Sequence, residues 1–268
     1  SIKVVDKYFE TDVLVLAIGH SARDTFKMLN HKNIYMEAKP FAVGVRIIHP
    51  QEMINENQYP INYSFLPSAS YKLTFKSKSG RGVYSFCKCP GGYVVNSRST
   101  PDGICVNGMS NYKRDSGFAN SAIVVTVSPE DFGSNPLDGI RFQEDLEQKA
   151  YNIGNGVIPI QRYVDYKNNT ISENINIDAF KGKTHLANIN DIFPNFINES
   201  LKEGIDYFNN KINGFNGDAS VIAAPEARTS SPVRIVRDED FNSNVKGIYP
   251  CGEGAGYAGG ITTSAMDG

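Results

Sequence analysis

The fold of this chain is decided by its last 22 residues, Gly247-Ile-Tyr-Pro-Cys-Gly252-Glu253-Gly254-Ala-Gly256-Tyr-Ala-Gly259-Gly260-Ile261-Thr-Thr-Ser-Ala-Met-Asp-Gly268. The apolar run from Ile248 to Cys251 predicts a short strand, and the glycine-rich segment behind it predicts a turn. Ile261 to Met266 predicts the start of a helix. A glycine-rich turn that leads into a helix N-terminus lets an anionic or electron-rich ligand approach backbone N–H groups closely. The segment is therefore a candidate ligand site.

Within this turn, Gly254-Ala-Gly256-Tyr-Ala-Gly259 matches the dinucleotide pattern G-x-G-x-x-G. That pattern requires a complete strand–helix–strand unit with an acidic residue about twenty positions further on. Only nine residues follow Gly259, so these glycines do not open such a unit. The alternative is a second cofactor-contacting turn of a flavoprotein whose first motif lies elsewhere.

The final stretch resembles the C-terminal flavin-binding motif of FAD-dependent oxidoreductases of the glutathione-reductase-like superfamily. It is more closely similar to the bacterial FAD-dependent proteins, also called NAD(FAD)-utilizing dehydrogenases, whose reaction is unassigned. The resemblance extends over nearly all of the chain, with further matching segments at residues 15–26, 82–96, 108–117 and 226–234. It implies that the chain is the C-terminal part of an FAD-dependent oxidoreductase, with NAD(P)H as the candidate electron donor.

The resemblance also implies a set of flavin-contacting residues. Gly19 ends a second strand–turn–helix signal and would lie beside FAD, and Glu253 would bond its ribityl chain. Gly259, Gly260 and Ile261 would direct N–H groups at the flavin's pyrimidine edge, where negative charge gathers on reduction. The full set of expected cofactor-binding residues is Gly19, Gly252, Glu253, Gly254, Gly259, Gly260 and Ile261. The alternative is a structural glycine loop that closes a sheet.

The chain begins Ser1-Ile-Lys without an initiating Met and ends inside the helix that the glycine turn opens. We therefore expect a fragment. In the resembled family the FAD pyrophosphate motif lies N-terminal to everything present here, so binding of FAD by this chain alone stays open.

The predicted fold class is α/β with an α+β insertion. Residues 1–40 and 219–268 are expected to be two segments of one FAD-binding, Rossmann-like domain, with Val13 to Ile18 as a buried parallel strand. Residues 41–218 are expected to form an inserted substrate or cap domain. There, short β-type runs predict a mixed or antiparallel sheet, and residues 140–151 and 194–213 predict helices.

Two other segments could carry chemistry. The thiols of Cys87-Lys-Cys89 could exchange electrons, and alternation along a strand would place both on one face. Inert thiols are the alternative. The segment Glu226-Ala-Arg228-Thr-Ser230-Ser231-Pro232 could orient a substrate carboxylate through Arg228, but it is also an ordinary turn composition. The catalytic residues stay unassigned, with Arg228, Ser230, Cys87 and Cys89 as candidates.

Single residues elsewhere carry weaker signals. His20 is expected to be a turn histidine bonded to the backbone rather than a catalytic base, and Ser21 to be a helix cap rather than a nucleophile. No metal site is expected, because neither a second C-x-C nor a His pair stands at a ligand spacing.

Composition excludes several classes of protein. The 27 basic and 29 acidic residues give a formal charge of −2, so a nucleic-acid partner is not expected and a tRNA-modifying flavoprotein is disfavoured. Apolar runs are too short for a membrane span, and we expect no signal peptide, because the N-terminal residues lack its charged and apolar regions. We expect a cytoplasmic protein with four reduced cysteines and a small-molecule substrate. The alternative function is a non-catalytic binding module with a structural or absent flavin.

Overall fold

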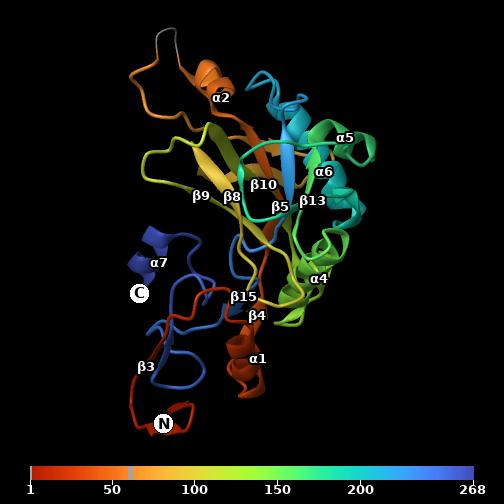
Figure 1. The fold of residues 1–268 in the computed structure, drawn as a ribbon. Helices are drawn as coiled ribbons and strands as arrows, with labels where there is room; N and C mark the ends of the chain where they lie inside the picture. Colours follow the sequence, from red (N-terminus) through yellow and green to blue (C-terminus); the bar gives the residue numbers. More distant parts are fainter. Residues whose placement is uncertain (1, 60–62) are drawn as a thin grey trace. The chain divides into compact units, whose positions relative to one another are not determined.

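The computed structural model describes residues 2–59 and 63–268. The chain is a mixed α/β protein, which confirms the predicted class (Figure 1). It divides into two compact units. The first unit is made of Ser1–Phe41, Val127–Gln143 and Arg228–Gly268, and the second of Ala42–Thr126 and Glu144–Ala227.

The first unit holds short paired strands and small helices. The hairpin strands β1 and β2 are antiparallel, β4 pairs with β15 in the same sense, and β3 pairs with β16 in parallel. The elements are β1 (Ile2–Val4), β2 (Lys7–Phe9), β3 (Leu14–Leu16), α1 (Arg23–His31), β4 (Met36–Ala38), α3 (Pro129–Phe132), β15 (Val233–Ile235), β16 (Ile248–Pro250) and α7 (Ile261–Asp267). Helix α4 (Asp138–Ile153) begins in this unit and continues into the second.

The core of the first unit lies between α1, the strand pair β4–β15 and the start of α4. Its buried side chains are Leu16, Phe26, Leu29, Ile34, Met36, Ile140, Val233 and Ile235. Helix α1 contributes Phe26 and Leu29, which stand three positions apart and so share one face. This core fixes the strand ends from which the glycine-rich turn leaves.

The expected parallel strand near the N-terminus is present, but its predicted burial is wrong. Strand β3 pairs in parallel with β16, whereas Val13 and Val15 are 56% and 58% exposed. Only every second side chain of a strand points to one face, and Leu16 takes the buried position. Val15 lies on the other face of β3, where its side chain is exposed.

The second unit is built on a large sheet with strand order β13-β11-β14-β5-β10-β7-β6. Strand β11 is parallel to β13 and antiparallel to β14, and β7 is antiparallel to both β10 and β6. This confirms the expected mixed sheet. The strands are β5 (Phe41–Pro50), β6 (Thr74–Lys76), β7 (Gly82–Cys89), β10 (Phe118–Val127), β11 (Ile158–Arg162), β13 (Thr184–Leu186) and β14 (Val221–Glu226).

A smaller sheet and several helices complete the second unit. The sheet has the order β12-β8-β9, formed by β12 (Phe180–Lys181), β8 (Gly92–Asn96) and β9 (Val106–Ser110). Val94 and Val106 of this sheet pack with Ile48, Ile160 and Val221 of the large one. The helices are α2 (Gln51–Gln58), α5 (Tyr163–Asn168), the short 3₁₀ helix η1 (Ile189–Asp191) and α6 (Asn195–Phe208).

The compact units differ from the expected segment boundaries in two places. Residues 127–143 group with the first unit, and the chain returns to that unit at Arg228 rather than at residue 219. Strand β14 explains the later return, because it pairs between β11 and β5 in the sheet of the second unit. The assignment of the segments to a flavin-binding domain and an inserted domain stays a prediction.

Two helix boundaries also differ from expectation. Helix α1 begins at Arg23 with Ala22 at the cap position, so Ser21 lies in the preceding turn and is not the cap. Helix α6 ends at Phe208 instead of Asn213, and Gly214 follows after further turns with a φ of +87°. Within the described residues, no helix is both long and apolar enough to cross a membrane.

Candidate functional site

The glycine-rich turn lies where two parallel strands of the first unit end together. Leu16 of β3 stands opposite Pro250 of β16. The turn behind each strand therefore leaves from the same edge. A Cβ atom placed on Gly254 would lie 2.4 Å from the carbonyl oxygen of Gly19, so glycine is required there for the two main chains to touch. The structure thus brings together Gly19 and the C-terminal turn, which the sequence analysis connected only through resemblance.

The side chains next to these two glycines, His20 after Gly19 and Glu253 before Gly254, also meet. Nδ1 of His20 lies 3.2 Å from Oε2 of Glu253, and about a quarter of each side chain or less is exposed. The expectation of a histidine bonded to the backbone is therefore wrong. His20 faces the carboxylate that the sequence analysis reserved for a cofactor sugar chain. This polar pair marks one side of the turn.

The last part of the turn is open. Gly259, Gly260 and Ile261 are exposed, and a Cβ atom on Gly259 would have no neighbour within 4 Å. The amide of Gly260 donates to Oγ1 of Thr263 at 3.1 Å. Among the described residues the amides of Gly259 and Ile261 have no recorded hydrogen-bond acceptor. Two of the three expected donors are thus available, and one is already used by the chain.

An ion pair that the sequence analysis missed fastens α7 to the start of the turn. Asp267 accepts a hydrogen bond of 2.7 Å from the amide of Gly252 and pairs with the guanidinium of Arg237. The hydrogen bond from Arg237 lowers the pKa of Asp267 and raises that of Arg237. Both groups therefore stay charged at neutral pH. Arg237 also stacks over the ring of Tyr257, 3.8 Å from its centroid.

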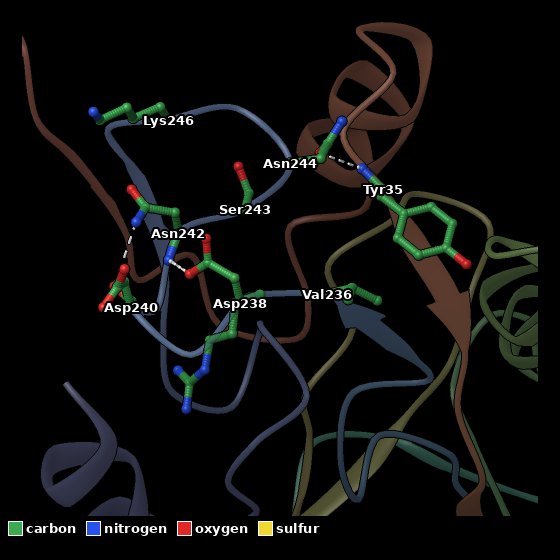
Figure 2. A pocket seen from close by; sticks show the side chains of 9 residues that line it. Tyr35, Val236, Asp238, Asp240, Asn242, Ser243, Asn244 and Lys246 are labelled. Carbon is green, nitrogen blue, oxygen red and sulfur yellow. Dashed lines mark hydrogen bonds between the residues drawn. The ribbon is translucent and has the colours of Figure 1, made fainter.

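A cavity of about 580 Å³ lies beside this anchor and is shaped by the loop from Val236 to Lys246. Figure 2 shows its polar lining, in which Asp238 accepts from the amide of Asn242 and Asn244 accepts from the amide of Tyr35, each at 2.8 Å. The side chains of Asp238 and Asn244 are thus already bonded to backbone amides of the protein. Arg237 lines the cavity, but none of the expected flavin-contacting residues does.

The segment from Glu226 to Pro232 does not act as one cluster. The boundary between the compact units falls between Ala227 and Arg228. Ser231 is buried and donates to the carbonyl oxygens of Val233 and Gly254, which supports the glycine turn from beneath. Arg228 and Ser230 are half-buried in the first unit. Their catalytic role stays a prediction.

Glu226 instead belongs to a buried ion pair of the second unit. Its two carboxylate oxygens accept from Nε and Nη2 of Arg46 at 2.8 and 2.9 Å, and both side chains are almost fully buried. The sequence signal was present. Arg46 interrupts the apolar run from Phe41 to Ile48, and a charge inside a buried strand requires a partner.

Cys87 and Cys89 lie on β7 in the second unit, next to Arg46. Cys87 is exposed and Cys89 is buried, so the two thiols differ in burial, and their placement on one face stays a prediction. Nη1 of Arg46 lies 3.9 Å from the sulfur of Cys89. Among the described residues, no group of three or more His, Cys, Asp or Glu side chains could hold a metal ion.

Comparison with known proteins gives two matches. Residues 40–229 match the family model described as "FAD-dependent protein, C-terminal domain-like". The chain is also 47% identical over 277 aligned residues to an uncharacterized protein of Clostridium beijerinckii. That alignment covers all of this chain but 52% of the relative, so the chain spans about half of the relative's length.

Proposed function

Because the chain belongs to the family of FAD-dependent proteins with this C-terminal domain, we propose that it is part of an FAD-dependent oxidoreductase. In this proposal the glycine-rich turn of the first unit contacts the flavin. The family match ends at residue 229. Support for the cofactor contact therefore comes from the geometry of the turn itself.

The observation that carries the proposal is the meeting of two parallel strand ends at Gly19 and Gly254. Ligands of α/β sheets bind in the crevice beyond the carboxyl ends of parallel strands, because the exposed backbone groups of the following turns converge there. Both turns leave that edge through glycine, so a planar ligand could approach the main chain without meeting side chains.

The turn also passes a test of fit to the cofactor. Gly254 is explained by its contact with Gly19, but the chain's own packing does not explain Gly259. Its φ is not in the left-handed region, and a side chain there would enter open space. An approaching ligand would account for a glycine at this position. The unbonded amides of Gly259 and Ile261 supply donors for an electron-rich ring edge.

The remaining residues would hold and orient the cofactor. Glu253 would accept hydrogen bonds from sugar-like hydroxyl groups, while His20 keeps its carboxylate oriented. Bound FAD supplies two-electron transfer between a donor and an acceptor. The proposal takes a small molecule as substrate and NAD(P)H as the electron donor to be tested.

The test is made on the longer protein that contains this chain. We expect it to purify with flavin absorbance and to release FAD on denaturation. Addition of NADH or NADPH under anaerobic conditions should bleach the flavin bands if either is the donor. A colourless protein that neither releases nor binds added FAD would contradict the proposal. Bound flavin that no donor or substrate reduces would instead favour the non-catalytic binding module.

A matched pair of variants tests the turn. Gly259→Val places a branched side chain in open space, so folding should persist while FAD is lost. Thr262→Val changes an exposed neighbour on α7 with almost no change of volume and should retain FAD. If Gly259→Val holds FAD as tightly as Thr262→Val, the flavin lies elsewhere in the protein.

A further inference from the structure

A second site is built around Arg46, across four neighbouring strands of the large sheet. Arg46 on β5 binds Glu226 on β14, Asn120 on β10 and the carbonyl oxygen of Cys87 on β7. The distances from Nη1 are 2.8 Å to Oδ1 of Asn120 and 3.0 Å to the oxygen of Cys87. The guanidinium is fully buried, so its charge acts on these groups with little screening by water.

Two β-bulges place the key side chains around this arginine. On β14, Ala223 stands opposite Arg46 and Glu226 opposite Gly44. The extra residue turns Glu226 to the face of Arg46, whereas regular alternation would have pointed it away. On β7, Cys89 stands opposite Asn120 and Phe86 opposite Ala122. Cys87 and Lys88 therefore share the space opposite one residue.

The second bulge explains why the two cysteines differ. Cys87 adopts a φ of +46°, a left-handed conformation that few non-glycine residues occupy. Its thiol is exposed, while that of Cys89 is 8% exposed and lies against Arg46. Strained residues and bulges gather at functional sites, because they re-aim a side chain. Here the re-aimed side chain is a thiol that faces solvent.

The two thiols differ in pKa as well as in exposure. A hydrogen bond from the Cys89 thiol, opposed by burial and aided by the charge of Arg46, lowers the pKa of Cys87 to about 6. The same hydrogen bond, together with burial, raises the pKa of Cys89. Cys87 is thus mainly a thiolate at neutral pH, while Cys89 keeps its proton.

The surrounding charged and titratable groups keep fixed states. Burial lowers the pKa of Arg46, but the charge and hydrogen bonds of Glu226, together with the nearby Cys89 and Cys87, raise it overall, so the guanidinium stays charged. Tyr71 bonds Ser121 at 2.8 Å and stays neutral, because burial raises its pKa. One polar group of the cluster is left unpaired. Nδ2 of Asn120 is buried without a hydrogen-bond partner in the part of the chain that the structure describes.

We propose that Cys87 and Cys89 form a dithiol–disulfide couple that exchanges electrons with small-molecule disulfides, with Cys87 as the attacking thiol and Cys89 as the resolving thiol. The exposed thiol is the one that a reagent in solution reaches, and the buried thiol lies two residues further on, with its sulfur 3.7 Å from the carbonyl oxygen of Cys87. The proposal does not depend on the proposed flavin site, since all of its residues lie in the second unit.

The reaction is balanced in two exchange steps. The Cys87 thiolate attacks one sulfur of a disulfide RS–SR, whose S–S bond breaks, and RS⁻ leaves and takes up a proton. The Cys89 thiol then gives up its proton, attacks the sulfur of Cys87 in the mixed disulfide and releases the second RS⁻, which takes up that proton. Two cysteine thiols are oxidised to one disulfide, and RS–SR is reduced to two thiols.

The first experiment treats the reduced, folded protein with glutathione disulfide. The remaining free thiols are then blocked with iodoacetamide in denaturant, because Cys89 and Cys105 are buried in the folded protein, and the peptides are mapped by mass spectrometry. We expect an internal Cys87–Cys89 disulfide, with Cys105 and Cys251 still alkylated. Cys89→Ser should accumulate one mixed disulfide per chain at Cys87, because the resolving thiol is gone. In Cys87→Ser, the remaining Cys89 should react with glutathione disulfide at least tenfold more slowly than Cys87 does in the unaltered protein. Cys105→Ala, a third thiol of the same unit, should behave as the unaltered protein.

The second experiment measures the rate of Cys87 alkylation against pH. A midpoint near pH 6 is expected, whereas an ordinary exposed thiol has a pKa near 8.5. At pH 5.5 the thiolate fraction should make Cys87 about 20-fold faster than such a thiol, even after allowance for its lower intrinsic nucleophilicity. Cys89→Ala should move the midpoint upward by removing the hydrogen-bond donor.

Three results would overturn the proposal. One is that Cys87 and Cys89 both remain alkylatable in excess glutathione disulfide. Another is that the unaltered protein keeps the mixed disulfide as long as Cys89→Ser does. The third is a midpoint for Cys87 alkylation near pH 8.5, the value of an ordinary exposed thiol. Circular dichroism of each variant confirms that the fold is intact, so a null result cannot be ascribed to unfolding.

Discussion

The buried charge of Arg46 requires hydrogen-bond partners from several surrounding residues. It lies fully buried in the middle of an apolar strand, and four partners converge on it. A buried charge is tolerated when it is paired and hydrogen-bonded, since its desolvation is otherwise very costly. The bidentate contact with Glu226 meets that condition. Gly108 is part of the same arrangement, because a Cβ atom there would lie 2.1 Å from Nη1 of Arg46.

We therefore predict that Glu226→Ala is strongly destabilising. The substitution leaves the Arg46 charge buried without its counter-ion, and the free energy of unfolding should fall by about 3–5 kcal/mol. Urea denaturation followed by circular dichroism measures this loss. Glu52→Ala removes an exposed carboxylate from α2 and should change stability by less than about 0.5 kcal/mol.

The double variant Arg46→Met with Glu226→Leu separates the ion pair from the site's packing. Replacing a whole buried pair by apolar residues of similar size is often neutral. The double variant should thus be more stable than Glu226→Ala alone. If it were less stable, the dominant contribution of Arg46 would be its bonds to Asn120 and Cys87 rather than to Glu226.

At the scale of elements, α6 packs on β7 through a glycine. Gly204 of the helix faces Val83 of the strand, and a Cβ atom on Gly204 would lie 2.5 Å from Cγ1 of that valine. Both residues are buried. The absent side chain therefore sets how closely the helix approaches the sheet that carries Cys87 and Cys89.

We predict that Gly204→Ala destabilises the protein although alanine is the better helix former. Alanine gains about 1 kcal/mol in helix propensity, whereas overpacking of a dense core costs about 1–3 kcal/mol. A net loss near 1 kcal/mol is expected in urea denaturation. Adding Val83→Ala should relieve the clash, so the double variant should lose less than the sum of the two single losses. A more stable Gly204→Ala would mean that the helix can shift outward freely.

At the scale of the whole molecule, the buried His49 makes the free energy of unfolding depend on pH. His49 is fully buried, and its Nε2 donates to the carbonyl oxygen of Phe215 at 2.8 Å in the neutral tautomer. Within residues 2–59 and 63–268, its Nδ1 has no hydrogen-bond partner. Burial outweighs that hydrogen bond and lowers the pKa of His49 from 6.5 to about 4. The folded state therefore binds a proton less readily than the unfolded chain.

This lowered pKa predicts a loss of stability in mild acid. The unfolded chain takes up the proton below its pKa near 6.5, so the His49 contribution is complete above that value and is lost as pH falls towards 4. A shift of this size corresponds to roughly 3 kcal/mol. Urea midpoints between pH 7.5 and 4.5 measure the effect. His49→Gln should flatten the pH dependence, and equal slopes for both proteins would contradict the assignment.

Sequence patterns predicted the elements that depend on local periodicity. Short β-type runs within residues 41–218 predicted a sheet, and the spaced apolar positions of residues 140–151 and 194–213 predicted helices where α4 and α6 lie. Val13 to Ile18 was predicted as a parallel strand and Ile248 to Cys251 as a short strand, but the pairing of β3 with β16 was not predicted. These features are local, because a strand or helix is specified mainly by which of its own residues face the core.

The contacts between distant residues that form the two sites could not be predicted from local sequence patterns. Glu226 was interpreted with its sequence neighbour Arg228, but its partner is Arg46, 180 positions away. Cys87 and Cys89 were expected in the regular alternation of a strand, but the bulge opposite Ser121 lies between them and the two thiols differ in burial. A bulge is a property of two strands in register, so one strand's sequence does not reveal it.

The hydrogen bond from the amide of Gly252 to the carboxylate of Asp267 joins the two ends of the C-terminal segment. The last residue of α7 thus holds the first glycine of the turn. A loop fastened at both ends has already lost most of its conformational freedom. A ligand that settles on Gly259 would therefore find a pre-organised surface, and little of its affinity would be spent on ordering the loop.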